Sequence, residues 1–344
     1  MKKLLNTLYV TTQGAYLTKD GETVLVKVEN EIRLRLPIHT LNGIVCFGVI
    51  SASPALMGMC CERDVTISFL SENGHFLARV QGPVSGNVLL RREQYRRSDD
   101  PIRSAAIARW LVAAKVTNSR VVLQRVLRDH PETFGAESLQ KNQQHLKHLL
   151  QELRRNNTSL ESIRGWEGEA AHAYFSVFDH LIITQKEAFH FSERSRRPPL
   201  DNINALLSFL YTLIVHDVSA ALESVGLDPQ VGYLHRDRPG RPSLALDLME
   251  EFRAYLADRL ALSLINRHQV SQKGFKTTES GAVTMDDDTR KIVIVAYQER
   301  KREEITHPFL NETIQIGLLP YVQAMLFARY LRGDLDAYPP FVWR

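Results

Sequence analysis

Two carboxylates and an imidazole lie close together in one segment of the sequence, and groups of this kind bind divalent metal ions. His235 follows a Gly-Tyr-Leu step at 232–234 in a turn-rich loop, and Asp247 and Glu250 stand three residues apart in the helix predicted to come next. Side chains at that spacing share one face of a helix, with Glu251 one residue further round. Carboxylate oxygens suit Mg²⁺ or Mn²⁺, and an imidazole nitrogen is compatible with Mn²⁺. The segment is therefore a candidate divalent-metal site.

A second acidic segment, 164–171, places Glu167 and Glu169 on either side of Gly168 in an otherwise amphipathic helix. A glycine inside a helix costs about 1 kcal/mol relative to alanine, so we expect something to approach the helix closely at the turn that contains Gly168. The alternative is that these acids only compensate the helix dipole. For the first segment, the alternative is that its two helical acids are solvated and its histidine is exposed. Spacing alone leaves these alternatives open.

Two regimes of hydrophobic pattern divide the chain. In the first, runs of high β propensity are separated by turn residues, with hairpin turns expected at Asp20-Gly21 and Asn73-Gly74 and a short helix over 53–62. The runs occupy 8–12, 16–17, 23–28, 32–36, 44–47, 65–70 and 75–80. The change of regime falls at Gly82 to Gly86, and from Leu89 onward the apolar spacing is helical.

The second regime predicts a series of helices and one small β-hairpin, over 274–285. The helices are expected over 102–129, 138–155, 159–179, 203–225, 244–266 with Ser243 as its cap, 288–303 and 314–331. At 344 residues the chain exceeds the usual size of a single core, about 250 residues. We therefore predict an α+β fold: a small β-rich amino-terminal domain (1–85), a linker (86–100) and a larger all-α carboxy-terminal domain (101–344).

The charge of the chain permits a polyanionic partner without requiring one. The net charge is +4, and the 43 basic residues comprise 12 Lys and 31 Arg. Arginine binds phosphate oxygens in a bidentate manner, although codon bias in a GC-rich genome would also raise its frequency. The candidate DNA-binding residues form one group at the domain junction and another beside His235. They are Arg91, Arg92, Arg96 and Arg97, then Arg236, Arg238 and Arg241; the alternative is a solvated basic surface.

The three cysteines and the lengths of the apolar runs predict the cell compartment in which the protein functions. Cys46, Cys60 and Cys61 lack the spacing of a zinc site, and we expect buried structural thiols that bind no metal and form no disulfide. No apolar run approaches the roughly 20 residues that span a bilayer, and the first ten residues do not resemble a signal peptide. A soluble, cytoplasmic protein without a membrane partner is expected.

Several sequence motifs, in the order in which they occur along the chain, resemble those of the CRISPR adaptation integrases, the first of the CRISPR-associated proteins. The matching phrases are Gly-Trp-Glu-Gly-Glu-Ala-Ala at 165–171, Arg-Pro-Pro at 197–199 with 202–213, Gly-Leu-Asp-Pro at 226–229 and the run 232–253. The most specific part is Leu-Asp-Leu-Met-Glu-Glu-Phe-Arg, which closes that run. The likeness spans the helical half and is looser in the β-rich half. The overall sequence is most similar to proteins of type I systems, subtype C.

The resemblance implies a catalytic metal site made of Glu167, His235 and Glu250, with Asp247 as a supporting acid or ligand. The family more often has Asp at the last metal-binding position, which leaves open whether Asp247 or Glu250 is the direct ligand. Glu169 is excluded only by the register of the motif.

The implied activity is a metal-dependent DNA integrase and endonuclease with Mg²⁺ or Mn²⁺ as cofactor. The 3′-hydroxyl of an incoming fragment (a spacer) would attack a phosphodiester at the boundary of a CRISPR repeat, in antiviral defence. The sequence contains no Gly-rich nucleotide-binding loop, in agreement with a transesterification. The implied partners are double-stranded DNA, a second copy of the chain joined through the β-rich domain, and the second CRISPR-associated protein as a bridge. Two other classes remain open: a metal-dependent repair nuclease and a non-catalytic DNA-binding scaffold.

Overall fold

The computed structural model describes residues 7–343 except 42, 64, 73–75, 81, 83–87, 133–134 and 155–157. The turn predicted at Asn73-Gly74, and most of the predicted change of regime at Gly82 to Gly86, lie outside these residues.

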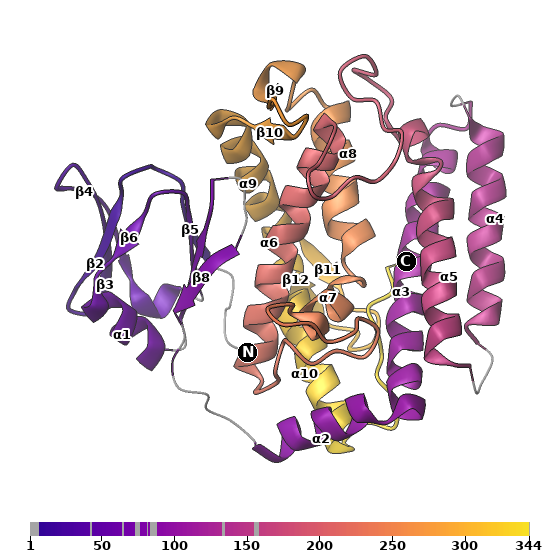
Figure 1. Ribbon diagram of the computed structural model, residues 1–344, viewed down its shortest axis with the longest axis horizontal. Coiled ribbons are helices and arrows are strands. Elements are labelled where there is room, and N and C mark those ends of the chain that lie inside the picture. The colour runs from indigo at the N-terminus through magenta and orange to yellow at the C-terminus, as the bar shows by residue number, and fades with distance from the viewer. Residues whose placement is uncertain are drawn as a thin grey trace. The chain divides into compact units, whose positions relative to one another are not determined.

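The strands before residue 81 form two four-stranded sheets in the described part of the chain (Figure 1). In the first, β1 (Thr7–Val10), β5 (Gly43–Phe47) and β7 (Thr66–Leu70) run parallel, and β8 (Phe76–Val80) is antiparallel to β7. In the second, the order is β4 (Glu31–Pro37), β3 (Thr23–Val28), β2 (Tyr16–Asp20) and β6 (Ser51–Ala52). A short 3₁₀ turn, Ile38–Thr40, precedes β5.

One apolar core joins these sheets to helix α1 (Pro54–Glu62). The helix begins where the sequence predicts, because Ser53 Oγ accepts a hydrogen bond from the backbone N–H of Leu56 at 3.2 Å. The three cysteines are free thiols; Cys46 and Cys60 are buried in the core, and burial raises the pKa of each to about 12. These two thiols therefore pack as small apolar side chains.

The chain after residue 87 is mainly helical (Figure 1). Its helices are α2 (Val88–Asp99), α3 (Pro101–Asp129), α4 (Ala136–Glu152), α5 (Leu160–Phe175), α6 (Asn202–Ser224), α7 (Ser243–Met249), α8 (Arg259–Asn266), α9 (Asp287–Arg302) and α10 (Leu319–Arg332). Short 3₁₀ turns cover Phe178–Leu181, Gln272–Gly274 and Ile316–Leu318. Helix α3 packs against α4 and α5, and α6 packs against α7 and α10. The predicted α+β fold class, β-rich first and helical afterwards, is confirmed.

Helix α6 is the one described helix long and apolar enough to cross a membrane by length and composition. Of its most apolar window, 67% is buried inside the protein, as in the core helix of a globular protein.

One short element agrees with the prediction, and two details differ from it. The hairpin at 274–285 is present as β9 (Phe275–Thr277) and β10 (Val283–Met285). A second pair, β11 (Glu304–Thr306) and β12 (Thr313–Gln315), was not predicted, so the last helix starts at Leu319 instead of 314. The segment predicted as a linker, 86–100, is helical over the whole of α2.

The prediction of one continuous helix over 244–266 is wrong. Helix α7 ends at Met249, a π-helical segment occupies Arg253–Asp258, and α8 follows. Ser243 is the first residue of α7 and not its cap, since its hydroxyl donates to the carbonyl of Arg236 at 3.2 Å. π-Helical turns are rare and are frequent at functional sites, and this one directly follows the predicted acidic residues.

The chain forms two compact units. One comprises Met1–Gly86 with Gln298–Glu303 and Gln315–Leu318; the other comprises Asn87–Tyr297, Glu304–Ile314 and Leu319–Arg344. All the predicted catalytic and DNA-binding residues belong to the second unit. The domain limits 1–85 and 101–344, and the dimerisation role of the first, stay predictions.

Candidate active site

The carboxylate of Asp247 fixes the loop that carries His235. Its Oδ2 accepts hydrogen bonds from the backbone N–H groups of Tyr233 at 2.6 Å and Leu234 at 2.9 Å. Its Oδ1 accepts from the backbone N–H of His235 at 2.9 Å and lies 2.6 Å from Nδ1 of the same residue. Asp247 is fully buried. With Nδ1 engaged, Nε2 is the imidazole nitrogen of His235 that can bind another group.

Gly232 allows this loop to lie against helix α7. A Cβ added at this position would lie 2.8 Å from the backbone carbonyl carbon of Ser243 and 2.9 Å from Oδ2 of Asp247. Both distances are too short for a real Cβ contact, and one of the atoms is backbone. The glycine is therefore required for the contact between the His235 loop and Asp247.

Gly232→Ala is expected to destabilise the protein by about 1–3 kcal/mol, because the loop must shift to relieve the overlap. Denaturant unfolding measures the change. Gly165→Ala is the matched control, since a Cβ there meets no atom within 4 Å. An alanine at 232 that unfolds at the same denaturant concentration as wild type would contradict the proposed packing.

Lys115 of α3 connects acidic residues from two other segments. Its Nζ forms an ion pair with Glu167 Oε1 of α5 and lies 2.9 Å from Glu250 Oε2 at the end of α7. The other oxygen of Glu250 accepts a hydrogen bond from Arg253 at 2.7 Å. The side chains of Lys115 and Glu250 are only 10% and 4% exposed, and that of Glu167 is 27% exposed. Two carboxylates from different helices thus share one ammonium group.

Glu250 is held in its charged form. Burial raises the pKa of its carboxyl, but the positive charges of Arg253 and Lys115 outweigh burial and lower the pKa to about 2. The carboxylate is therefore ionised at physiological pH, which a metal ligand requires.

The structure thus brings the predicted metal-binding residues together in two pairs. Glu167 meets Glu250 through Lys115, and His235 meets Asp247. Among the described residues, no group of three or more His, Cys, Asp or Glu side chains is arranged to hold a metal ion. The residue types and charges still fit a divalent cation, because both glutamates already bind one cationic group. The convergence of Glu167, His235 and Glu250 on a single ion stays a prediction.

Two neighbouring acidic residues, Glu169 and Glu251, belong to neither of these pairs. Glu169 is half exposed and lies 2.9 Å from Nε2 of His145, so it faces α4. Glu251 is buried and accepts hydrogen bonds from the hydroxyl of Tyr338 at 2.6 Å, the side chain of Gln323 at 2.8 Å and the backbone N–H of Phe341 at 2.7 Å. Glu251 therefore fixes the carboxy-terminal segment against the helix that carries the site.

No described part of the chain makes the close approach expected at Gly168: a Cβ there would meet no atom within 4 Å, and the residue is exposed. The sequence argument also missed Lys115 and Arg253. The only sequence signal for Lys115 is a single charge within the apolar stretch 111–116.

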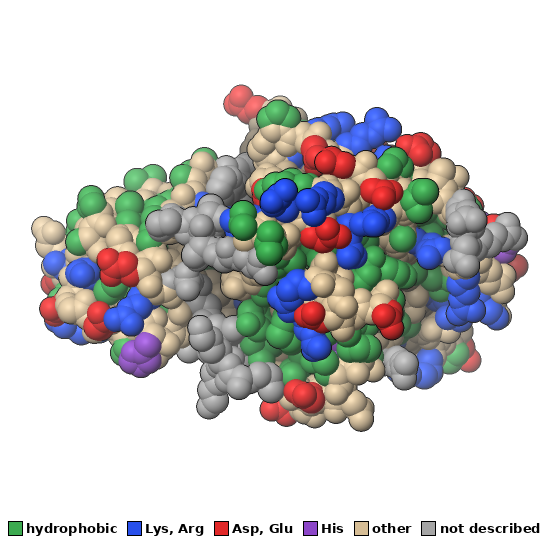
Figure 2. Space-filling model, turned by 90° about the horizontal axis from the view of Figure 1, so that it is seen from below, with side chains coloured by type: hydrophobic (Ala, Val, Ile, Leu, Met, Phe, Trp, Pro, Cys, Tyr) green, Lys and Arg blue, Asp and Glu red, His purple; other side chains and the backbone are tan. Residues whose placement is uncertain are grey.

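The predicted DNA-binding arginines of the first group, on α2, differ in how far their side chains are exposed to solvent. Arg97 donates to Glu93 at 2.9 Å and to the carbonyl of Leu331 at 3.2 Å, and it lies 4.6 Å above the ring of Tyr330. Arg97 is therefore engaged within the protein, while Arg92 and Arg96 are exposed and Arg91 is half-buried; DNA binding by these four residues stays a prediction. Figure 2, which views the molecule from the side of α2, shows basic side chains interleaved with acidic and apolar ones.

The second group is part of a larger basic surface. Arg236 and Arg238 are exposed, and burial together with the charges of Arg238, Arg197 and Arg196 lowers the pKa of Arg241. Arg196 and Arg197 are exposed as well and were not predicted. We call Arg196, Arg197, Arg238 and Arg241 the arginine cluster. Two of its members, Arg238 and Arg241, follow His235 in the sequence by three and six positions.

The described segments thus contain a buried acid that orients a histidine, two further acids that share one cation, and exposed arginines. The family model described as CRISPR associated protein Cas1 matches residues 8–299. The chain belongs to this family, and the predicted resemblance is confirmed.

Full-length relatives are highly similar. The chain is 58% identical over 344 residues to "CRISPR-associated endonuclease Cas1 1" of Chlorobaculum tepidum, covering 100% of both chains. It is 53% identical over 347 residues to "CRISPR-associated endonuclease Cas1 2" of Rhodospirillum rubrum, again covering 100% of both.

Solved structures share the fold. A Cas1 protein from Thermotoga maritima is 23% identical with a TM-score of 0.79, covering 95% of this chain and 97% of the other. A casposase bound to its integration product is 24% identical with a TM-score of 0.82, covering 96% and 92%. A chain of a Cas6-RT-Cas1–Cas2 complex is 23% identical with a TM-score of 0.84, covering 100% of this chain and 36% of the other.

Proposed function

We propose that this chain is a Mg²⁺- or Mn²⁺-dependent DNA integrase and endonuclease that inserts short DNA fragments into a CRISPR repeat array. The observation that carries the proposal is the meeting of Glu167 and Glu250 at the ammonium group of Lys115, together with the orientation of His235 by Asp247. Family membership supports it, since the relatives at 58% and 53% identity are named CRISPR-associated endonucleases.

In this proposal Glu167, Glu250 and Nε2 of His235 hold the ion, and Asp247 is a positioning residue. Both oxygens of Asp247 already accept hydrogen bonds from the loop, whereas Glu250 is ionised and paired with a movable ammonium group. A bound divalent ion would polarise the scissile phosphate and stabilise negative charge on the departing 3′-oxygen. Arg253 keeps a fixed positive charge at the carboxylate of Glu250.

The reaction is a transesterification. The 3′-hydroxyl of the fragment loses its proton to solvent and attacks a phosphodiester of the repeat. One P–O bond forms, another breaks, and the 3′-oxygen of the repeat leaves and takes up a proton from solvent. Because one bond replaces another of the same kind, no nucleotide cofactor is needed.

The proposed partners are double-stranded DNA, a second copy of the chain and the second CRISPR-associated protein. The arginine cluster, Arg236, Arg92 and Arg96 offer guanidinium groups for phosphate oxygens. The casposase of similar fold is bound to an integration product, and another similar chain comes from a complex with Cas2. Assembly as a homodimer bridged by this second protein is proposed on that basis.

A strand-joining assay separates the proposed activity from the two alternatives. A labelled fragment with a free 3′-hydroxyl is incubated with a supercoiled plasmid carrying a repeat, with Mn²⁺ or Mg²⁺. The proposed integrase transfers the label to the plasmid. A repair nuclease would cut without transfer of label, and a binding scaffold would retard the DNA and leave it unchanged.

Arg196→Ala with Arg197→Ala is expected to weaken DNA binding to a similar extent for all sequences. The slope of log affinity against log salt should decrease by up to about 2, at roughly 0.9 per phosphate contact. Fluorescence anisotropy across a salt series measures both effects. Arg128→Ala, an exposed arginine that pairs with Asp129, is the control. An unchanged slope in the double variant would remove the arginine cluster from the DNA interface.

A further inference from the structure

Lys115 is a buried cation in the position where the proposed metal site needs one. Its side chain is 10% exposed, and its ammonium group contacts both Glu167 and Glu250. An ammonium group buried to this extent is stable only while it is paired. A divalent ion that binds both glutamates would therefore compete directly with Lys115.

Arg253, the other cation at Glu250, is fixed in place. Its guanidinium group donates to Glu250 at 2.7 Å and lies 4.3 Å above the ring of Tyr211. Lysine, by contrast, carries a compact charge on a flexible four-carbon stem. Lys115 is therefore the cation at this site that can move.

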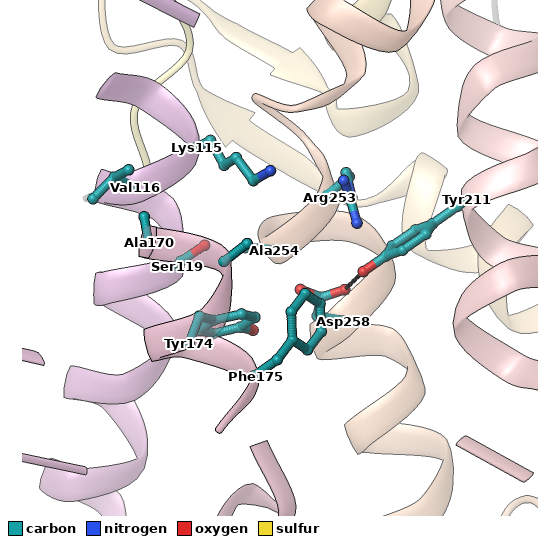
Figure 3. A pocket seen from close by; sticks show the side chains of 11 residues that line it. Lys115, Val116, Ser119, Ala170, Tyr174, Phe175, Tyr211, Arg253, Ala254 and Asp258 are labelled. Atoms are coloured by element: carbon teal, nitrogen blue, oxygen red, sulfur yellow. Dashed lines mark hydrogen bonds between the residues drawn. The ribbon is translucent and has the colours of Figure 1, made fainter. Parts of the chain in front are cut away.

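A cavity lies beside Lys115 and provides a destination. Its polar lining includes Lys115, Ser119, Arg253, Tyr211 and Asp258, and the rest is mainly apolar. Figure 3 shows Lys115 and Arg253 on one side of the cavity and Asp258, bound to the Tyr211 hydroxyl, on another. The hydroxyl donates to Asp258 Oδ1 at 2.6 Å. Asp258 is a buried carboxyl group that lines the same cavity as Lys115 and could accept a displaced ammonium group.

We propose that Lys115 closes the metal position between Glu167 and Glu250, and that a divalent ion enters by displacing its ammonium group toward Asp258. This proposal rests on the proposed function of the site. The ammonium group keeps its proton and its charge; one cation replaces another at the two glutamates. Metal binding and the position of Lys115 are thereby coupled.

Calorimetric titration of the full-length protein with MnCl₂ tests the coupling without any activity measurement. Lys115→Met removes the competing charge at similar length, so it is expected to bind Mn²⁺ roughly tenfold or more tightly than wild type, within the usual range of coupling between two ligands. Lys115→Arg keeps a positive charge and should gain no affinity. Lys141→Met, at an exposed position on α4, is the matched control and should bind as wild type.

The side-chain NMR signals of Lys115 in the wild-type protein give a second readout that does not depend on a variant folding. They are expected to shift on addition of Mg²⁺, while those of Lys141 do not. Wild type that binds Mn²⁺ with unchanged Lys115 signals, or a folded Lys115→Met variant with wild-type affinity, would overturn the displacement and leave the proposed function intact. Wild type that binds no Mn²⁺ would overturn both.

Discussion

Glu167→Ala and His235→Ala are each expected to reduce strand joining by at least roughly a hundredfold in Mn²⁺ or Mg²⁺, since loss of a metal ligand removes several kcal/mol of charge stabilisation from the transition state. Both side chains are partly exposed, at 27% and 24%, so neither removal creates a large core cavity. DNA binding should largely survive, because arginine contacts to phosphate carry most of the affinity. Joining of labelled fragments measures the first effect, and anisotropy measures the second.

Glu169→Ala is the matched control for these variants. Glu169 lies two residues from Glu167 on the same helix, is half exposed and pairs with His145. It should join fragments at the wild-type rate. Wild-type joining by either Glu167→Ala or His235→Ala would refute the catalytic assignment. Thermal melting identifies any variant that is inactive only because it is unfolded.

The second large effect concerns the buried carboxyl group of Glu251. Burial raises the pKa of this group from 4.5 to about 8, in spite of the hydrogen bonds from Tyr338, Phe341 and Gln323. In the unfolded chain it ionises near its ordinary value, so between these two pH values the folded protein binds more protons than the unfolded chain. Its contribution to stability is fully present below pH 4.5 and is lost as pH rises through about 8.

Glu251→Gln is expected to remove this dependence, because the amide resembles the protonated carboxyl group and does not ionise. The free energy of unfolding of wild type should fall relative to the variant by several kcal/mol over that pH range, at about 1.36 kcal/mol per pKa unit. Urea unfolding of both proteins at acidic and alkaline pH measures the difference. Glu279→Gln, in the exposed turn between β9 and β10, is the control. Parallel pH profiles for wild type and Glu251→Gln would show that Glu251 keeps an ordinary pKa.

Much of the fold was accessible from sequence periodicity alone. Long helices such as α3 and α6 bury a face at helical spacing, and Ser53 and Ser159 carry the caps that fix their helix starts. Strands β9 and β10 flank the turn residues Ser280-Gly281, whereas β11 and β12, of the same length, were missed because 307–312 between them contains no glycine turn signal.

Only part of the candidate site could be predicted from the sequence. Motif resemblance named Glu167, His235 and Glu250, but it could not separate the roles of Asp247 and Glu250. Their difference arises because α7 ends at Met249 and a π-helical segment follows, which no local propensity indicates.

Contacts between segments that lie far apart in the sequence could not be predicted from the sequence. Lys115 meets its acidic partners across 52 positions of sequence in one case, and Arg196 and Arg197 join Arg241 only through the folded loop. Such pairings depend on tertiary packing, which composition and spacing do not encode locally.

The most direct test is anomalous diffraction from crystals of the wild-type protein soaked in MnCl₂. The proposed site predicts one strong peak per chain, within about 2.0 to 2.6 Å of carboxylate oxygens of Glu167 and Glu250 and of Nε2 of His235, with Asp247 still bound to the His235 loop. A peak coordinated by Asp247 in place of Glu250, or full Mn²⁺ occupancy elsewhere with Lys115 still between the two glutamates, would contradict it.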